Sequence, residues 1–508
     1  MATSVEFNSI PSNLRVPLFY AEVNSGQSPY QGPSRTLLIG QMSAAGTATA
    51  NVPVILSGDP QPQMGAGSML SEMAIWARQN NPFGEIWMLP LADPPGTRQS
   101  WTLTVAPGIV GQAGIISVYI GGYLIQVGVQ TTDTQASIAA NLVAAIAEGY
   151  YDFGRQLAFP VTAVQGGAGA TNVVTLTAIN SGALAASQSI VLNLIGNEGP
   201  LQQYLAVATG AAGTGTPALG AALAALGDQA FDFIGSPYAD ANSLNTIQTF
   251  LGGTSGRWSP IQQIYGHYLT VMFDTFANLS AFGSGRNDPN VSIMGVAESP
   301  SSPWRWAAAY ASIIANDKNL GGTVDQAYRI SRPVQTLALV GIKPPQNRVN
   351  WFNIQQRQTL YQDGIAGFTV QIDGTVALDR VVTTYQTNSY GQPDITWLDV
   401  ETRLQMVYFV RYMRQRITQD YGRCALADDN PTGNPGVVTV TILKAACIQI
   451  YQELYNGGLV DNPALFAQSL VVVRSADPNR VDAYLPVDVV NQFRVFAANA
   501  TTFLEFPS

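Results

Sequence analysis

Apolar residues in the first part of the chain follow two different spacings. Residues 36–40 and 85–91 are short and almost continuously apolar, as expected for strands of a parallel sheet that is covered on both faces. Between them, residues 68–79 place their apolar side chains at helical spacing. This order predicts a strand, a helix and a second strand at the beginning of a parallel sheet.

The same alternation returns after residue 214. The expected helices cover residues 218–226, 241–251 and 304–314, and the expected strands cover residues 231–234, 269–274, 291–295 and 335–340. Strands that are separated by helices favour an open α/β sheet. Residues 25–96 and 214–345 are therefore predicted to form one α/β core domain.

Residues 97–213 interrupt this core and differ from it in composition. Charged residues are sparse there, Pro94, Pro95 and Gly96 precede the segment, and a glycine-rich stretch follows it. Short strands are expected at residues 101–105, 114–120, 124–129, 173–178 and 190–194, and a helix at residues 137–147. We interpret the segment as an inserted β-rich peripheral domain whose ends lie in flexible linkers.

Residues 346–486 are expected to form a C-terminal α+β domain. A helix near residues 350–361 leads to a β-hairpin, in which Asp373 and Gly374 supply two turn residues at positive φ. The apolar positions of this hairpin are Phe368, Val370, Ile372, Val376, Leu378 and Val382. Asp399 is a candidate N-cap for the next helix, and the further elements are a helix at 439–455 and paired strands at 470–474 and 480–485.

Three arginines lie within one arc of the helix predicted for residues 399–418. Arg403, Arg411 and Arg414 fall within about 80° when successive residues turn by about 100°. They form either a salt-bridged face, including an Asp399–Arg403 pair worth about 0.3–0.5 kcal/mol, or a contact for an acidic neighbour. We favour the salt-bridged face.

Both ends of the chain read as extended arms, residues 1–24 and 487–508. Their apolar residues are too few to form a core, whereas a strand added to the sheet of another subunit satisfies its backbone groups. The candidate residues for such strand exchange between subunits are Val5, Phe7, Ile10, Phe493, Val495, Phe496 and Phe503.

Composition limits the function further. Only 11% of the 508 residues are charged, the net charge is −9, and Lys318, Lys343 and Lys444 are the only lysines, which argues against direct binding of nucleic acid. The first residues lack the features of a signal peptide, and no run of 18 apolar residues predicts a membrane insertion. Cys424 and Cys447 have no second cysteine at metal-binding spacing.

The sequence does not favour an enzyme. His267 is the only histidine, and Tyr265, Gly266 and Tyr268 around it form no nucleophile motif. The stretch at residues 252–256 has the wrong spacing for a nucleophile elbow, and there is no P-loop lysine. We therefore expect no catalytic residue, no cofactor site and no metal site, and a structural role for His267.

Several short motifs carry a resemblance to a known family. They are Tyr361 to Ile365 (YQDGI), residues 383–388 (TTYQTN), residues 398–402 (LDVET), residues 10–17 (IPSNLRVP), residues 477–482 (DPNRVD) and residues 491–497 (NQFRVFA). They resemble the contractile tail sheath proteins of Mu-like bacteriophages, in which the first three motifs follow one another in this order, with Gln362 as a one-residue insertion here. Residues 97–213 contribute nothing to the resemblance.

The resemblance implies a structural protein of the virion tail, assembled in the cytoplasm of the host bacterium. Such protomers form stacked hexameric rings around a tail tube and contract to drive the tube through the host envelope for genome delivery, without a cofactor. The implied core is subtilisin-like in shape, with residues 346–486 facing the tube. The implied partners are the protein itself, the tail tube protein, and the baseplate and tail terminator proteins.

Two alternatives belong to other classes. A host-surface-binding adhesin module would rest on the inserted β-rich domain. A hydrolase would rest on the subtilisin-like shape of the core.

Overall fold

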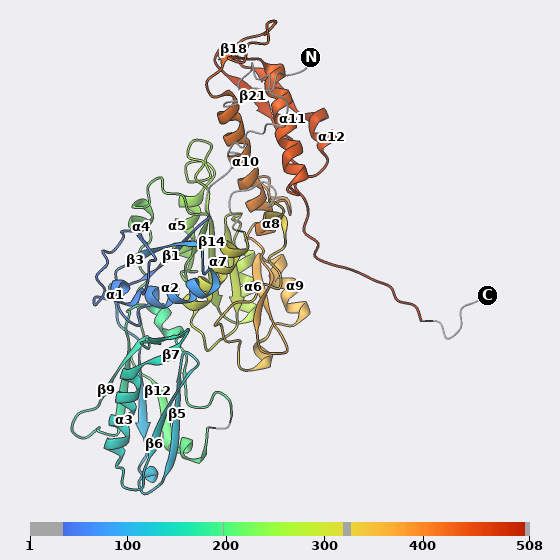
Figure 1. The fold of residues 1–508 in the computed structure, drawn as a ribbon. Helices are drawn as coiled ribbons and strands as arrows, with labels where there is room; N and C mark the ends of the chain where they lie inside the picture. Colours follow the sequence, from blue (N-terminus) through green and yellow to red (C-terminus); the bar gives the residue numbers. More distant parts are fainter. Residues whose placement is uncertain (1–33, 197, 319–326, 503–508) are drawn as a thin grey trace, which may run out of the picture.

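The computed structural model describes residues 34–196, 198–318 and 327–502. Figure 1 shows three lobes: a central α/β lobe, a β-rich lobe at the bottom and a helical lobe at the top. Residues 100–209 build the bottom lobe, and the chain after residue 400 builds the top lobe.

One eight-stranded mixed sheet forms the centre of the molecule. Its six inner strands are parallel, and an antiparallel strand closes each edge. In spatial order the strands are β17 (Val376–Arg380), β16 (Ile365–Val370), β15 (Val291–Val296), β14 (His267–Phe273), β13 (Phe233–Gly235), β1 (Arg35–Gln41), β3 (Glu85–Leu91) and β2 (Val54–Ile55). The apolar runs predicted as buried strands thus lie in the interior of the sheet.

Two long helices, α2 (Met69–Asn80) and α7 (Pro303–Asp317), pack against each other and against the sheet. Nearly all their residues are buried, including Trp76 and Trp306. Ser68 caps α2, and its hydroxyl accepts a hydrogen bond from the N–H of Ser71. The other helices of this lobe are α1 (Gln61–Met64), α4 (Gly220–Ala224), α5 (Ala241–Leu251), α6 (Phe276–Ser284), α8 (Tyr328–Ser331), α9 (Ile354–Gln362) and the 3₁₀ turn Arg348–Asn350.

Residues 335–340 do not form the expected strand. Thr336 has a φ of 69°, which breaks the extended run, and only an isolated bridge joins Ala338 to Ala377. The predicted helix α5 has the expected bounds, whereas α6 was not expected. The sheet also continues past residue 345, where we expected the core to end, because β16 pairs in parallel with β15.

The β16–β17 hairpin is present with a different turn. Gly374 has a φ of 86°, but Asp373 is not among the residues with positive φ, so the prediction of two such residues is wrong. The loop between the paired residues Val370 and Val376 is five residues long. Ile372 lies in this loop and is exposed, whereas Phe368 is buried.

The inserted segment forms two larger antiparallel sheets, a short antiparallel hairpin and one long helix. One sheet has the order β12 (Leu205–Thr209), β4 (Ser100–Val105), β10 (Val173–Ala178), β9 (Val161–Gln165), and the other β11 (Ile190–Val191), β5 (Gly114–Ile120), β6 (Tyr123–Val129). Helix α3 (Gln135–Glu148) begins at a capping box of Thr134 and Ser137. The sequence did not reveal β9, β12 or the hairpin of β7 (Tyr150–Asp152) and β8 (Arg155–Leu157); 3₁₀ turns cover Pro107–Ile109, Ala183–Ser187 and Pro200–Tyr204.

The top lobe is built on the helix α10 (Val400–Tyr421). Its 22 residues span about 33 Å at 1.5 Å per residue. Tyr451 packs edge-to-face on Phe409 and stacks on Phe466 with ring centroids 3.7 Å apart. The remaining elements are α11 (Val440–Asn456), α12 (Pro463–Ser469), the short parallel pair β18 (Ala425–Leu426) and β19 (Val437–Val438), and the antiparallel pair β20 (Val471–Arg474) and β21 (Val481–Tyr484).

Candidate functional site

The single histidine is enclosed in the central sheet. His267 begins β14, and its Nε2 lies 2.9 Å from the Ser292 hydroxyl oxygen on the neighbouring strand. Burial, and then the charge of Arg403, lower the pKa of His267 to about 3, so the imidazole is neutral at neutral pH. A buried, neutral imidazole that bonds to a serine of its own sheet is a structural group.

Hydrogen bonds within the protein close the space beyond the carboxyl end of β1. The parallel strands β1 and β13 are neighbours, but β1 is followed by strands on one side of the pair and β13 by strands on the other side. In open α/β sheets, ligands typically bind beyond the carboxyl ends of two such strands. Here Gln41 Nε2 donates to Asp93 Oδ1 and to the carbonyl of Ser181, both at 2.7 Å. Asn180 donates to Asp93 at 2.8 Å, and the Tyr238 hydroxyl donates to Gln41 at 3.2 Å. The Asn180 side chain and the Ser181 carbonyl, both from the inserted lobe, thus lie beside the carboxyl end of β1.

A buried ion pair joins the inserted lobe to the core. Arg305 of α7 contacts Glu72 of α2, with Nη2 2.5 Å from Oε1 and Nε 3.2 Å from Oε2. The same guanidinium donates to the carbonyl of Gly121 and to the Tyr150 hydroxyl, both at 3.1 Å and both in the inserted lobe. Burial alone lowers the pKa of Arg305, but the attraction of Glu72 reverses this effect and leaves the pKa above its usual value.

Aromatic rings surround this ion pair. Trp76 of α2 packs edge-to-face on Tyr123 and Phe153 of the inserted lobe, with centroids 6.3 and 5.2 Å apart. Arg305 lies over the Trp76 ring at 4.3 Å, and the Lys343 ammonium lies over the Tyr123 ring at 4.0 Å. The inserted lobe therefore packs against the core through desolvated groups.

The segments that enter and leave the inserted lobe are hydrogen-bonded to each other. The Thr97 and Thr214 hydroxyl oxygens lie 2.9 Å apart, and the N–H of Gly213 donates to the Gln99 side chain at 2.9 Å. Their glycine-rich composition led us to expect flexible linkers. That expectation is wrong in this structure, because glycine here allows two chain segments to approach closely.

The three arginines of α10 do not form one exposed stripe. Arg403 is buried, lies 3.6 Å from the Trp258 ring centroid and 4.5 Å from that of Trp397, and donates to Asn290 Oδ1 at 2.6 Å. Burial lowers its pKa to about 10. Arg411 pairs with Asp232 at 2.6 Å, and the exposed Arg414 reaches Gln263 at 3.3 Å. All three contact the central lobe, a relation that helical spacing alone cannot reveal.

Asp399 occupies the N-cap position of α10, but its side chain does not cap the helix. Instead its carboxylate binds Arg380 of β17 through two hydrogen bonds of 2.9 Å and Arg494 at 3.2 Å. The expected pair of Asp399 with Arg403 is therefore wrong. The acidic group serves partners that are distant in sequence.

The predicted arm residues divide into described and undescribed positions. Val5, Phe7, Ile10 and Phe503 lie outside the described residues. Phe493, Val495 and Phe496 are 69%, 79% and 81% exposed. Figure 1 shows the chain after α12 and the β20–β21 hairpin running down and then away from the three lobes.

The β20–β21 hairpin is a two-stranded sheet, and no other described strand pairs with either of its edges. Val471, Val473 and Tyr484 are 50%, 49% and 65% exposed. An apolar groove of about 510 Å³ lies beside it; the lining includes Phe409, Met413, Leu443, Val472 and Leu485. A hairpin with open edges is a site for added strands.

A chain with three packed lobes, a buried histidine and a projecting C-terminal segment has the features of a structural subunit. Models of the phage tail sheath protein central domain and the phage tail sheath C-terminal domain match residues 212–384 and 392–502. Over 503 residues the chain is 31% identical to the Mu-like prophage FluMu tail sheath protein of Haemophilus influenzae, covering 97% of this chain and 98% of that protein. The chain belongs to the phage tail sheath family.

Solved structures show a weaker likeness to the chain. A sheath tail protein from Desulfitobacterium hafniense is 14% identical, with a TM-score of 0.47 over 93% of this chain and 97% of that chain. The helical sheath of the anti-feeding prophage in its contracted state is 11% identical, with a TM-score of 0.42 over 97% of this chain and 99% of that chain.

Family membership confirms the resemblance noted in the sequence. The protein is a tail sheath protein of a contractile phage-like system, and the adhesin alternative is not favoured. It is thus a tail component associated with the virion, and its family is a structural one. Among the described residues, no helix combines the length and apolarity that crossing a membrane requires.

Proposed function

We propose that the protein polymerises as stacked hexameric rings, wound helically around a tail tube, and that contraction of this sheath drives the tube through the host envelope for genome delivery. The observation that carries the proposal is the C-terminal segment, which leaves its own subunit with Val495 and Phe496 exposed. Such a segment needs a second surface for its apolar side chains. Neighbouring subunits of a sheath supply that surface.

Strand addition is the proposed form of this contact. The arms beginning near Val5 and Val495 are donated, and the open edges of the β20–β21 hairpin receive them. Four to six new hydrogen bonds at about 0.5–1.5 kcal/mol net stabilise each contact by several kcal/mol. Contacts of this kind can persist while the lobes move relative to their neighbours.

The lobes are assigned different positions in the sheath. The inserted lobe, residues 97–213, lies at the periphery, and the C-terminal α+β lobe faces the tube protein. We place the start of that lobe near Val400, where the helix α10 begins after the last strand of the central sheet. Arg414 is the exposed one of the three arginines and the best candidate for a charged contact with the tube.

The further partners are the baseplate and tail terminator proteins, with assembly in the cytoplasm of the host. The central sheet shares only the shape of a subtilisin-like core in this proposal, because His267 is enclosed and hydrogen bonds close the space beyond the carboxyl end of β1. Movement draws on energy stored in the assembled lattice, without catalysis, a metal or a cofactor. Nucleic acid and membrane are not direct partners.

Negative-stain electron microscopy of the purified protein tests the proposal. The expected result is tubes with a regular axial repeat, and deletion of residues 1–12 or of residues 495–508 should give folded subunits that do not polymerise. Globular trimers that bind host cells would instead support an adhesin. Normal tubes from either truncation would refute strand exchange by that arm.

A further inference from the structure

The beginning of the C-terminal arm is attached to its own subunit. The N–H of Val490 donates to the carbonyl of Leu459 at 3.1 Å, and Gln405 of α10 donates to the carbonyl of Val490 at 2.7 Å. Val489 also forms an isolated bridge with Val460. Residues 488–494 therefore follow the surface of the top lobe and return to the junction of α10 with the central lobe.

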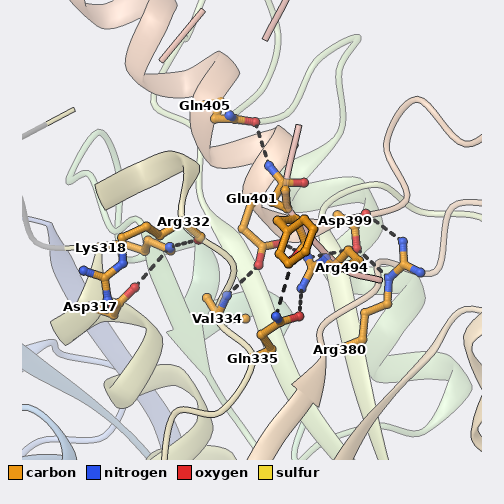
Figure 2. Close-up of polar contacts among 12 residues, drawn as sticks. Asp317, Lys318, Arg332, Val334, Gln335, Arg380, Asp399, Glu401, Gln405 and Arg494 are labelled. Atoms are coloured by element: carbon orange, nitrogen blue, oxygen red, sulfur yellow. Dashed lines mark hydrogen bonds and ion pairs between the residues drawn. The ribbon is translucent and has the colours of Figure 1, made fainter. Parts of the chain in front are cut away.

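Arg494 is the last residue of this attached stretch. Its Nη2 lies 2.8 Å from Glu401 Oε2 and 3.2 Å from Asp399 Oδ1, and its Nη1 donates to Gln335 at 3.4 Å. Figure 2 shows the Arg494 guanidinium between Glu401, Asp399 and Gln335, with Arg380 on the far side of Asp399. Residues 495–502 make no hydrogen bond to another described residue, so the attachment ends at Arg494.

Glu401 depends on Arg494 as its counterion more than Asp399 does. The Glu401 side chain is fully buried, and its second oxygen accepts only the N–H of Val334 at 2.8 Å among its described direct hydrogen bonds. Asp399 keeps Arg380 as a partner, whereas the nearest ion-pair partner of Glu401 is Arg494. A buried carboxylate without a counterion is strongly unfavourable.

The anchor lies where two lobes meet. Gln335 and Val334 follow the helix α8, Arg380 ends the central sheet at β17, and Asp399 and Glu401 begin α10. A pull on the arm would therefore reach both the sheet and the long helix of the top lobe.

We propose that Arg494 is a positioning residue that fixes the root of the C-terminal arm to the junction of the central and top lobes, so that only the chain from residue 495 onward is donated to a neighbouring subunit. This inference rests on the proposed exchange of arms. It shortens the predicted arm of residues 487–508 to 495–508. Fourteen extended residues reach about 46–50 Å.

The anchor should also depend on pH. Burial raises the pKa of Glu401 above its ordinary value even though Arg494 opposes this shift. Four other groups face Glu401. They are Asp399 at the start of α10, Tyr310 of α7, Lys318 directly after α7, and Arg380 of β17. A raised pKa means that the folded protein binds more protons than the unfolded chain, so the contribution of this group to stability falls as pH rises through its titration. Removing the charge of Arg494 raises the pKa of Glu401 further, and the resulting loss of stability should be larger at about pH 8 than at about pH 5.

The test uses the full-length chain with Arg494→Gln, and Arg480→Gln as the control, since Arg480 pairs with Asp482 on the exposed surface of the top lobe. Arg494→Gln should lower the midpoint of thermal unfolding at about pH 8, with a smaller effect at about pH 5, whereas Arg480→Gln should change neither. Adding Glu401→Gln should restore the midpoint because the buried charge is gone. Equal midpoints for Arg494→Gln and the parent at both pH values would overturn the anchor.

Tube formation distinguishes a positioning role of Arg494 from a role in folding. In the folded double variant with Arg494→Gln and Glu401→Gln, the protein concentration required for tube formation should rise by about tenfold, which corresponds to roughly 1.4 kcal/mol. The single variant Arg494→Lys keeps the positive charge beside Glu401. Its critical concentration for tube formation should therefore rise less than that of the double variant. Tubes of the double variant at the parental concentration would overturn the positioning role and leave the sheath function intact. A parent chain that forms no tubes would contradict the proposed function itself.

Amide hydrogen exchange of the unassembled parent gives a result that does not depend on any variant. The N–H of Val490 is bonded and should be protected, whereas residues 495–502 should exchange as an unfolded chain does. Uniformly fast exchange across residues 488–502 would contradict the anchor. Protection that continues to residue 502 would contradict a donated segment that begins at residue 495.

Discussion

The junction at Arg305 and the junction at Arg494 use the same chemistry for different purposes. Each arginine binds a buried glutamate, at 2.5 Å in the Arg305–Glu72 pair and 2.8 Å in the Arg494–Glu401 pair. The side chain of Arg305 is fully buried and aromatic rings surround it, whereas that of Arg494 is 13% exposed and the chain beyond it is open to solvent. An arginine and a buried acid can thus attach a whole lobe permanently or hold the root of a segment that leaves.

The difference lies in what covers each ion pair. At Arg305 the inserted lobe closes over the pair and adds its own carbonyl and hydroxyl groups. At Arg494 the covering element is the short attached segment that carries Arg494 itself. We therefore expect disruption of the first junction to affect folding more and disruption of the second to affect assembly more.

The largest effect is expected when residues 97–213 are replaced by a short Gly-Ser linker. The sequence alone suggested a peripheral domain on flexible linkers, but this change exposes Trp76 and removes two partners of Arg305. Several uncovered side chains at about 1.5–3 kcal/mol each predict a loss near 5 kcal/mol in the free energy of unfolding, measured in urea. The control replaces only the exposed loop 166–171. A fully stable replacement would show that the inserted lobe is loosely attached.

Arg305→Gln tests the ion pair itself. Loss of one partner leaves Glu72 buried without its counterion, and such changes destabilise proteins by about 3–5 kcal/mol. Arg155→Gln is the matched control, because Arg155 lies 3.8 Å from Asp59 at the surface of the same lobes. Denaturant midpoints of the two variants give the comparison. Equal midpoints would show that the buried pair stabilises the fold no more than the surface pair does.

Truncation on either side of the arm root should have a moderate effect. A chain that ends after Arg494 keeps the anchor, whereas a chain that ends after Gln492 loses it, with an expected difference of about 1–3 kcal/mol. Both truncated chains should fail to polymerise, because both lack residues 495–508. Calorimetry measures the stability difference, and equal unfolding temperatures would contradict an anchor at Arg494.

The smallest effect on folding is expected for Arg414→Glu. Arg414 is exposed, so its reversal should change stability by less than about 0.5 kcal/mol, while Arg403→Glu should disrupt the packing of Trp258 and Trp397. If Arg414 contacts the tube, the reversed protein should leave its tubes at lower salt than the parent. Unchanged retention on tubes, measured by co-sedimentation, would exclude Arg414 as the contact.

Local pattern was sufficient for much of the fold. The buried runs predicted β1, β3, β14 and β15 to within a few residues, and helix periodicity predicted α2, α5 and α11. It failed where conformation depends on a single residue, as at Thr336, and where strands are short and half-exposed, as in the β7–β8 hairpin. Short motifs identified the family because they are read along the sequence. Recognising them does not require knowing how the lobes pack.

The sequence by itself determined the order of the elements, the extended character of the C-terminal segment and the family. Only the tertiary structure decided which charges meet. Arg305 and Glu72 are 233 residues apart and Arg494 and Glu401 are 93 apart, so no local spacing predicts either pair. The physical reason is that a buried charge must find its partner wherever the folded chain excludes water, and the packing of the lobes sets that place.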